Sequence, residues 1–118
     1  MSLYIAWVGE VIIKDEYRKD FGHLFRGEYE QIEAKRILDF LDEYMYAFTC
    51  IQHWVHWDYK PEWKGRYQTS YNRETGSFVY GAAYNLHGRS MWSMHEFFHE
   101  LLPGMTERVI SEDGWAEE

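Results

Sequence analysis

The sequence has a single cysteine, Cys50, only two prolines and no long apolar run. One cysteine excludes an internal disulfide framework and a cysteine-rich zinc site. It is typical of a protein kept in a reducing compartment, so we expect a cytoplasmic protein. No apolar segment approaches the roughly 18 residues of a membrane-spanning helix. The start of the chain shows no basic region followed by an apolar stretch, and we therefore expect no signal peptide.

Positive charge is also scarce, with 12 Lys and Arg against 20 Asp and Glu, which gives a formal net charge of −8. A charge of this sign is repelled by nucleic acid and by anionic membranes, and we expect neither as a partner. It permits a basic protein partner. The same charge is also typical of a protein that is simply soluble.

Aromatic side chains are abundant and make up 19% of the 118 residues. A chain of this length is expected to form one domain with its own core, here spanning residues 1–118. We expect most of the aromatic rings to lie in that core; the alternative is an exposed aromatic binding face. Residues 112–118 are expected to form an acidic tail, either extended or flexible.

Hydrophobic periodicity in the first half predicts a strand, a helix and a second strand. Residues 4–13 are apolar on both faces, which is typical of a buried central strand. Residues 14–27 show no clear period and are expected to be loop, with a short turn of helix as the alternative. An apolar stripe predicts a helix over 28–46, with acidic residues in its first turns. Alternation over 48–59 predicts a strand that ends at Lys60-Pro61.

The second half predicts a hairpin, a helix and a short strand. The hairpin joins 66–72 to 77–87 through a four-residue turn that ends in Gly76. The helix covers 90–102 and is expected to stop at Pro103-Gly104, and residues 108–111 form the last strand. The order β-α-β-β-β-α-β predicts an α+β domain, with two helices packed on a mostly antiparallel sheet of four to five strands.

The segment from Ser90 to Gly104 contains His95-Glu96-Phe97-Phe98-His99, which matches the HExxH pattern of zinc-dependent hydrolases. Histidines four residues apart on a helix point the same way and can hold one Zn²⁺. The intervening Glu can then take a proton from metal-bound water. Over this one helix the chain resembles the active-site helix of zincin metallopeptidases. The resemblance implies His95 and His99 as zinc ligands and Glu96 as the general base.

An ordinary amphipathic helix explains the same segment. A continuous apolar arc runs along it, with the two histidines at the edge of the arc; its members are Met91, Met94, Phe97, Phe98, Leu101 and Leu102. The extended metzincin pattern would need Gly at position 102 and His at position 105, where the chain has Leu102 and Met105. We therefore favour a surface helix without a cofactor and keep a zincin-like hydrolase with Zn²⁺ as the alternative.

A second metal hypothesis involves His53, His56 and Asp58. On a strand, residues three apart point to opposite faces, so His53 and His56 do not converge. His56 and Asp58 share a face, and one of them could supply a third ligand to the helical pair. The ordinary interpretation is that these histidines lie at the boundary of the sheet and bind no metal.

Three functions remain open. The favoured one is a non-enzymatic interaction or accessory protein, of the inhibitor, immunity or mobile-element kind, because no convincing catalytic group is present. Aromatic residues are enriched at interface centres, which makes Trp54, Trp57, Tyr59 and Trp63 the candidate anchors if they prove exposed. The others are the zinc hydrolase and a small-ligand binder with a pocket lined by Tyr67, Tyr80 and Tyr84. A homodimer is compatible with all three.

Overall fold

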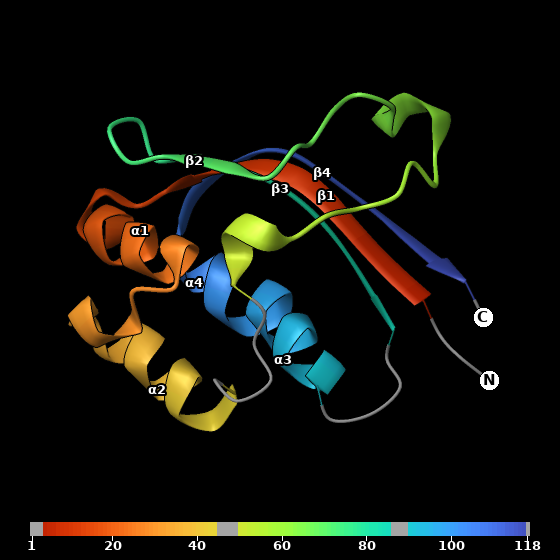
Figure 1. The fold of residues 1–118 in the computed structure, drawn as a ribbon. Helices are drawn as coiled ribbons and strands as arrows, with labels where there is room; N and C mark the ends of the chain where they lie inside the picture. Colours follow the sequence, from red (N-terminus) through yellow and green to blue (C-terminus); the bar gives the residue numbers. More distant parts are fainter. Residues whose placement is uncertain (1–3, 45–49, 86–89, 118) are drawn as a thin grey trace.

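The structure, a computed structural model, describes residues 4–44, 50–85 and 90–117 and contains one four-stranded antiparallel sheet. The strands are β1 (Tyr4–Ile13), β2 (Ser70–Asn72), β3 (Ser77–Asn85) and β4 (Thr106–Glu117), and they lie in the order β2-β3-β1-β4 (Figure 1). The helices are α1 (Arg18–Arg26), α2 (Lys35–Tyr44), α3 (Ser90–Glu96) and α4 (Leu102–Met105). Short 3₁₀ turns are η1 (Asp15–Tyr17), η2 (Tyr29–Gln31), η4 (Ile51–His53) and η5 (Pro61–Trp63), and η6 (Phe97–Leu101) is a π-helical turn. The predicted α+β class is confirmed.

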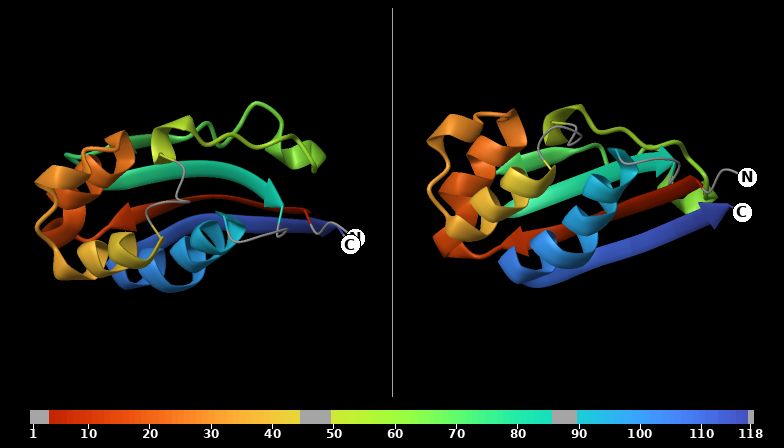
Figure 2. Two further views of the ribbon diagram at one scale, coloured as in Figure 1. Left: turned by 60° about the horizontal axis from the view of Figure 1, so that its bottom comes forward. Right: turned by 90° about the horizontal axis from the view of Figure 1, so that it is seen from below.

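The helices cover one face of the sheet, and the segment of residues 54–69 crosses the opposite face (Figures 1 and 2). The main core lies between helices and sheet, and a smaller cluster of Ala6, Val8 and Trp63 lies under the segment. β1 contributes alternate residues to both clusters and pairs with β3 on one side and β4 on the other. It is therefore the buried central strand that the sequence predicts. Among the described residues, no helix combines the length and the apolarity needed to cross a membrane.

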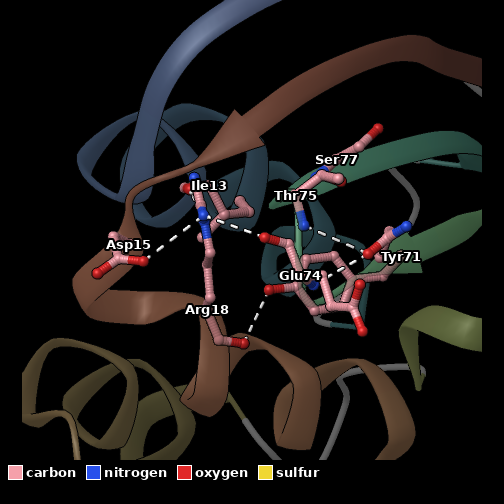
Figure 3. Close-up of polar contacts among 8 residues, drawn as sticks. Ile13, Asp15, Arg18, Tyr71, Glu74, Thr75 and Ser77 are labelled. Carbon is pink, nitrogen blue, oxygen red and sulfur yellow. Dashed lines mark hydrogen bonds and ion pairs between the residues drawn. The ribbon is translucent and has the colours of Figure 1, made fainter.

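The turn between β2 and β3 is fixed to the start of α1 by Arg18 (Figure 3). The guanidinium of Arg18 donates to the carbonyl oxygens of Ile13 (3.0 Å) and Glu74 (3.4 Å). The hydroxyl of Tyr71 donates to the carbonyl oxygen of Arg18 at 2.8 Å. These bonds link the predicted hairpin, which is confirmed, to the helical layer.

Two predictions in the first half differ from the structure, one for a loop and one for a helix. Residues 18–26, expected to be loop, form α1, because Phe21 and Leu24 face the core and Gly27 ends the helix in a left-handed conformation. The helix expected over 28–46 begins only at Lys35. Its first turn is capped by the carboxylate of Asp20 on α1, which accepts from the backbone N–H of Ala34 at 2.9 Å.

The strand expected over 48–59 is also wrong for the residues that the structure describes. Residues 51–53 form η4, and residues 54–60 are irregular. The backbone is extended at Trp54 and turns back at 57–59, where the N–H of Tyr59 donates to the carbonyl of Trp57 at 2.8 Å. Among the described residues its one ladder-like bond to β3 runs from the N–H of Ala83 to the carbonyl of Val55 at 3.0 Å. The sheet consequently has four strands, at the lower end of the expected range. Residues 45, 46, 48, 49, 86 and 87 of the predicted elements lie outside the described residues.

The last helix and strand are both longer than expected. The helical stretch does not stop at Pro103 but continues as α4 to Met105, because Pro103 lies in the first turn of α4, where its missing N–H has no bond to make. β4 runs from Thr106 to Glu117 and takes in the predicted strand 108–111 together with most of the acidic tail, which is thus extended. Two register shifts against β1 leave Ile110 and Glu107 as extra, bulged residues.

Candidate functional site

His95 and His99 lie side by side at the junction of α3 and η6. Their ring centroids are 4.2 Å apart, with the planes inclined by 46°. The turn between them is π-helical, which is wider than the α-helical turn on which the HExxH geometry depends. His99 is exposed, and its ring meets the ring of Trp7 edge to face at 5.6 Å. The structure therefore brings the two histidines together as a tilted pair, in which His99 packs on Trp7 of β1 and His95 lies beside Tyr84 of β3.

The environment of His95 is polar on one side and buried on the other. Trp7 donates its indole N–H to the hydroxyl of Tyr84 at 2.8 Å, and this hydroxyl lies 3.4 Å from Nδ1 of His95. Burial, and secondarily the neighbouring His99, lower the pKa of His95. Glu96 is half-buried beside the pair.

No third metal ligand joins the histidines within residues 4–44, 50–85 and 90–117. These ranges contain no group of three or more His, Cys, Asp and Glu side chains that could hold a metal ion. His53 is exposed and lies apart on η4, whereas His56 and Asp58 are close to each other, with Nδ1 and Oδ1 3.8 Å apart. The arrangement among described side chains is thus two imidazoles without a zincin-like third ligand.

The four predicted interaction residues divide into two roles. Trp54 is 6% exposed and packs on Phe97 at 5.0 Å between ring centroids, and Trp63 is 1% exposed in the smaller core. Neither ring is accessible, so these two do not meet the condition of exposure on which the anchor prediction depends. Tyr59 is half-buried, stacked at 3.9 Å on Trp115 of β4. Trp57 is 59% exposed.

Val55, which is 70% exposed beside Trp57, is not among the predicted anchors. In extended backbone, alternate residues point to opposite sides. Trp54 and His56 accordingly point inward, and Val55 and Trp57 point to solvent. The alternation that suggested a strand is the signal that could have found Val55.

Asp113 holds the segment of residues 54–69 to β4. One carboxylate oxygen accepts from Nζ of Lys60 at 2.8 Å, and the other accepts from the indole N–H of Trp63 at 2.9 Å. These bonds lower the pKa of Asp113, the one to Lys60 most, so the carboxylate stays ionised. The sequence offered no signal for Asp113, since its partners lie about fifty residues away.

A histidine fixes the same segment at a second point. The ring nitrogens of His56 lie 3.1 Å and 3.0 Å from the carbonyl oxygens of Trp57 and Arg66, so the ring bridges two parts of the segment. An added Cβ on Gly81 would clash with this ring, which explains why β3 carries glycine at this position. Gly81 of β3 thus leaves room for the segment of residues 54–69 to pack closely on the sheet.

A groove of about 690 Å³ lies on the helical side of the sheet, between β4 and the stretch 97–105. Trp7, Tyr80, Phe98 and Leu102 line it with apolar surface, and its wall includes His99. Charged residues that border it are Glu107, Arg108, Glu112 and Asp113, and of these Asp113 turns its carboxylate to the opposite face. Sequence reasoning identified Tyr80 and His99 separately but not the groove, because β4 was expected to be short.

The three tyrosines proposed for a ligand pocket do not meet. Tyr80 and Tyr84 lie on the helical face of β3, whereas Tyr67 packs against the smaller core on the opposite face. Of the three, Tyr80 lines the groove. The hydroxyl of Tyr84 accepts a hydrogen bond from the indole N–H of Trp7.

Comparison with known proteins finds no match. No protein-family model matches the chain, and neither a curated protein nor a solved structure is significantly similar to it. The function is therefore argued from the geometry of the chain itself.

Proposed function

We propose that this chain is a non-enzymatic protein-interaction or accessory domain that presents Trp57 and Val55 to a protein partner. The observation that carries the proposal is the exposure of these two large apolar side chains, 59% and 70%, on a segment that is otherwise fixed. Tryptophan is among the residues that contribute most at interface centres, and binding residues are often carried on loops held by a rigid scaffold.

The fixation of the segment supports a recognition role. Residues 54–69 contain little regular structure, yet Asp113, His56 and the stacking of Tyr59 on Trp115 hold them at three points. A segment that is already ordered loses less conformational freedom when it binds, so more of the contact energy remains as affinity. An untethered loop of this length would lose much of that advantage.

The partner is expected to be a basic protein. The net charge of −8 attracts positively charged surfaces and speeds the encounter with them. It disfavours nucleic acid and anionic membranes as partners for the same reason. Inhibitors, immunity proteins and mobile-element products are accessory proteins of this size, and the single Cys50 favours the cytoplasm as the location.

Affinity capture with three immobilised proteins tests the proposal: the wild type, Trp57→Ala and Glu74→Ala. Glu74 is exposed on the β2–β3 turn and serves as the matched surface control. We expect the wild type and Glu74→Ala to retain the same protein from an extract of the source cells, and Trp57→Ala to bind the purified partner about 30-fold more weakly. Equal affinity of Trp57→Ala and the wild type would refute the proposal. Sedimentation of each protein alone, run first, identifies a homodimer as the partner.

The zinc-hydrolase alternative has a direct test in metal analysis. We expect protein purified without chelator and then dialysed against zinc to carry no stoichiometric metal, because the described histidine pair lacks a third ligand. Near-stoichiometric zinc that is lost in a His95→Ala/His99→Ala variant would establish the metal site and displace the interaction proposal for this helix.

A further inference from the structure

The floor of the groove is built by two aromatic rings that lie over glycines. The hydroxyl of Tyr80 lies over Gly9 of β1, where an added Cβ would be 2.7 Å from it. The ring of Trp7 lies over Gly114 of β4, where an added Cβ would be 2.9 Å from the ring. A side chain at either position would clash with the ring above it, so the aromatic floor depends on both glycines.

The hydroxyl of Tyr80 is a polar group at this floor whose hydrogen-bonding capacity is not used by the described residues. Tyr80 is 4% exposed, and its hydroxyl makes no hydrogen bond to any of the described residues, although it borders the groove. Burial first, and the negative charge of Glu112 second, raise the pKa of Tyr80 well above its usual value. The hydroxyl therefore stays protonated and keeps both a proton to donate and lone pairs to accept.

Glu112 stands opposite this hydroxyl. It pairs with Gly9 across the β1–β4 ladder, and directly paired residues share a face, so its carboxylate projects on the same side as Tyr80. Among the described residues Glu112 takes part in no ion pair, whereas the charge of Asp113 is matched by Lys60. Glu107 and Arg108 at the edge are opposite in sign. The groove is left with one unmatched negative charge beside an aromatic floor.

We propose that the groove binds a small organic amine, with its flat apolar body on Trp7 and Phe98 and its ammonium group between the Glu112 carboxylate and the Tyr80 hydroxyl oxygen. Aromatic faces attract cations, and the carboxylate adds a charge-assisted hydrogen bond. The volume of about 690 Å³ is of the size that small-molecule sites have. The negative net charge of the chain raises the local concentration of cations further.

This site lies across the sheet from Trp57, so the amine proposal is independent of the protein partner proposed above. The floor also explains which ligands are disfavoured. An anionic ligand of the same shape is repelled by the carboxylate of Glu112. A neutral ligand removes water from that carboxylate without supplying a counter-charge. We therefore expect the groove to bind a cationic ligand more tightly than neutral or anionic ligands of the same shape.

A titration of ¹⁵N-labelled protein with three indoles tests the inference: tryptamine, the neutral alcohol 3-(2-hydroxyethyl)indole, and indole-3-propionate. We expect saturable shifts of the Gly9 and Gly114 amides with tryptamine, at an affinity about tenfold or more above that of the alcohol, and none with the acid. Glu112→Gln should reduce the tryptamine affinity to that of the alcohol. Glu74→Gln, on the distant β2–β3 turn, should leave it unchanged, and the dispersed spectra of both variants verify that they fold.

Several outcomes would overturn the inference. Equal binding of tryptamine and the alcohol, or unchanged tryptamine binding by Glu112→Gln, would show that the carboxylate does not select an ammonium group. No shift at about 10 mM tryptamine would show that the groove is not an amine site. Binding of an N-acetyl-lysinamide probe without binding of tryptamine would assign the groove to a side chain of a protein instead.

Discussion

Replacing Asp113 by alanine tests whether one carboxylate holds residues 54–69 on the sheet. The change removes the acceptor of the Trp63 indole N–H, and a hydrogen bond to a charged group contributes about 1.5–3 kcal/mol. It also removes the pair with Lys60, which is partly exposed and contributes about 0.2–1 kcal/mol. We expect a loss of about 2–3 kcal/mol in the free energy of unfolding. For a domain of this size that lowers Tm by about 10 °C.

Urea and thermal unfolding measure the effect, with Glu107→Ala as the control on the same strand. Asp113→Asn keeps an oxygen acceptor for Trp63 but loses the charge, so its loss is expected to be about 1 kcal/mol. Cleavage of residues 54–69 by a protease should be faster in Asp113→Ala than in the control. If Asp113→Ala falls within about 0.5 kcal/mol of Glu107→Ala, the tether is not what fixes the segment.

The same carboxylate gives the pH dependence a definite sign. Because the folded-state pKa of Asp113 is below the ordinary value of 3.8, its stabilising contribution is fully present above that value. The contribution declines as the pH falls below 3.8 and is lost once the folded-state pKa is passed. The difference in unfolding free energy between wild type and Asp113→Asn should therefore be constant near neutrality and shrink below about pH 4.

Three further outcomes are expected. Trp54→Ala should lower the unfolding free energy by about 3–5 kcal/mol, whereas Trp57→Ala should change it by less than about 0.5 kcal/mol, because only the first ring is buried. Gly81→Ala should cost about 1–3 kcal/mol in urea unfolding, since the new methyl group meets the His56 ring and a backbone carbonyl. Because the pKa of His95 is lower in the folded state than in the unfolded state, the unfolded state takes up the proton at a higher pH as the pH falls. Stability should consequently fall between pH 7.5 and about 5.5, less so in His95→Gln; an identical slope in the variant would contradict this.

The elements that the sequence predicts correctly are those whose signal is local. β1 is apolar on both faces because it is covered on both, and the β2–β3 turn ends in Gly76 with a positive φ of 78°. The missed helix α1 also carried a local signal, in Phe21, Leu24 and Phe25 at helical spacing. The start of α2 did not, since its cap is the carboxylate of Asp20 fourteen residues away.

The segment of residues 54–69 shows where alternation stops being informative. Alternation reports that one side of an extended backbone is buried and the other is not, and this holds for Trp54 and Val55. It does not report whether a neighbouring strand has a free edge for pairing. The sequence does not predict the groove for a related reason. Its residues Tyr80, Glu112 and Trp7 lie on three different strands, and they come together only through the register between those strands.

The two bulges of β4 decide what can add to the open edge of the sheet. With Ile110 and Glu107 out of register, the regular spacing of backbone groups is confined to the stretch from Ser111 to Glu117. That stretch carries Glu112, Asp113 and Glu117, so a second copy laid against it would bring like charges together. Charge repulsion therefore disfavours edge-to-edge pairing of two copies along this stretch.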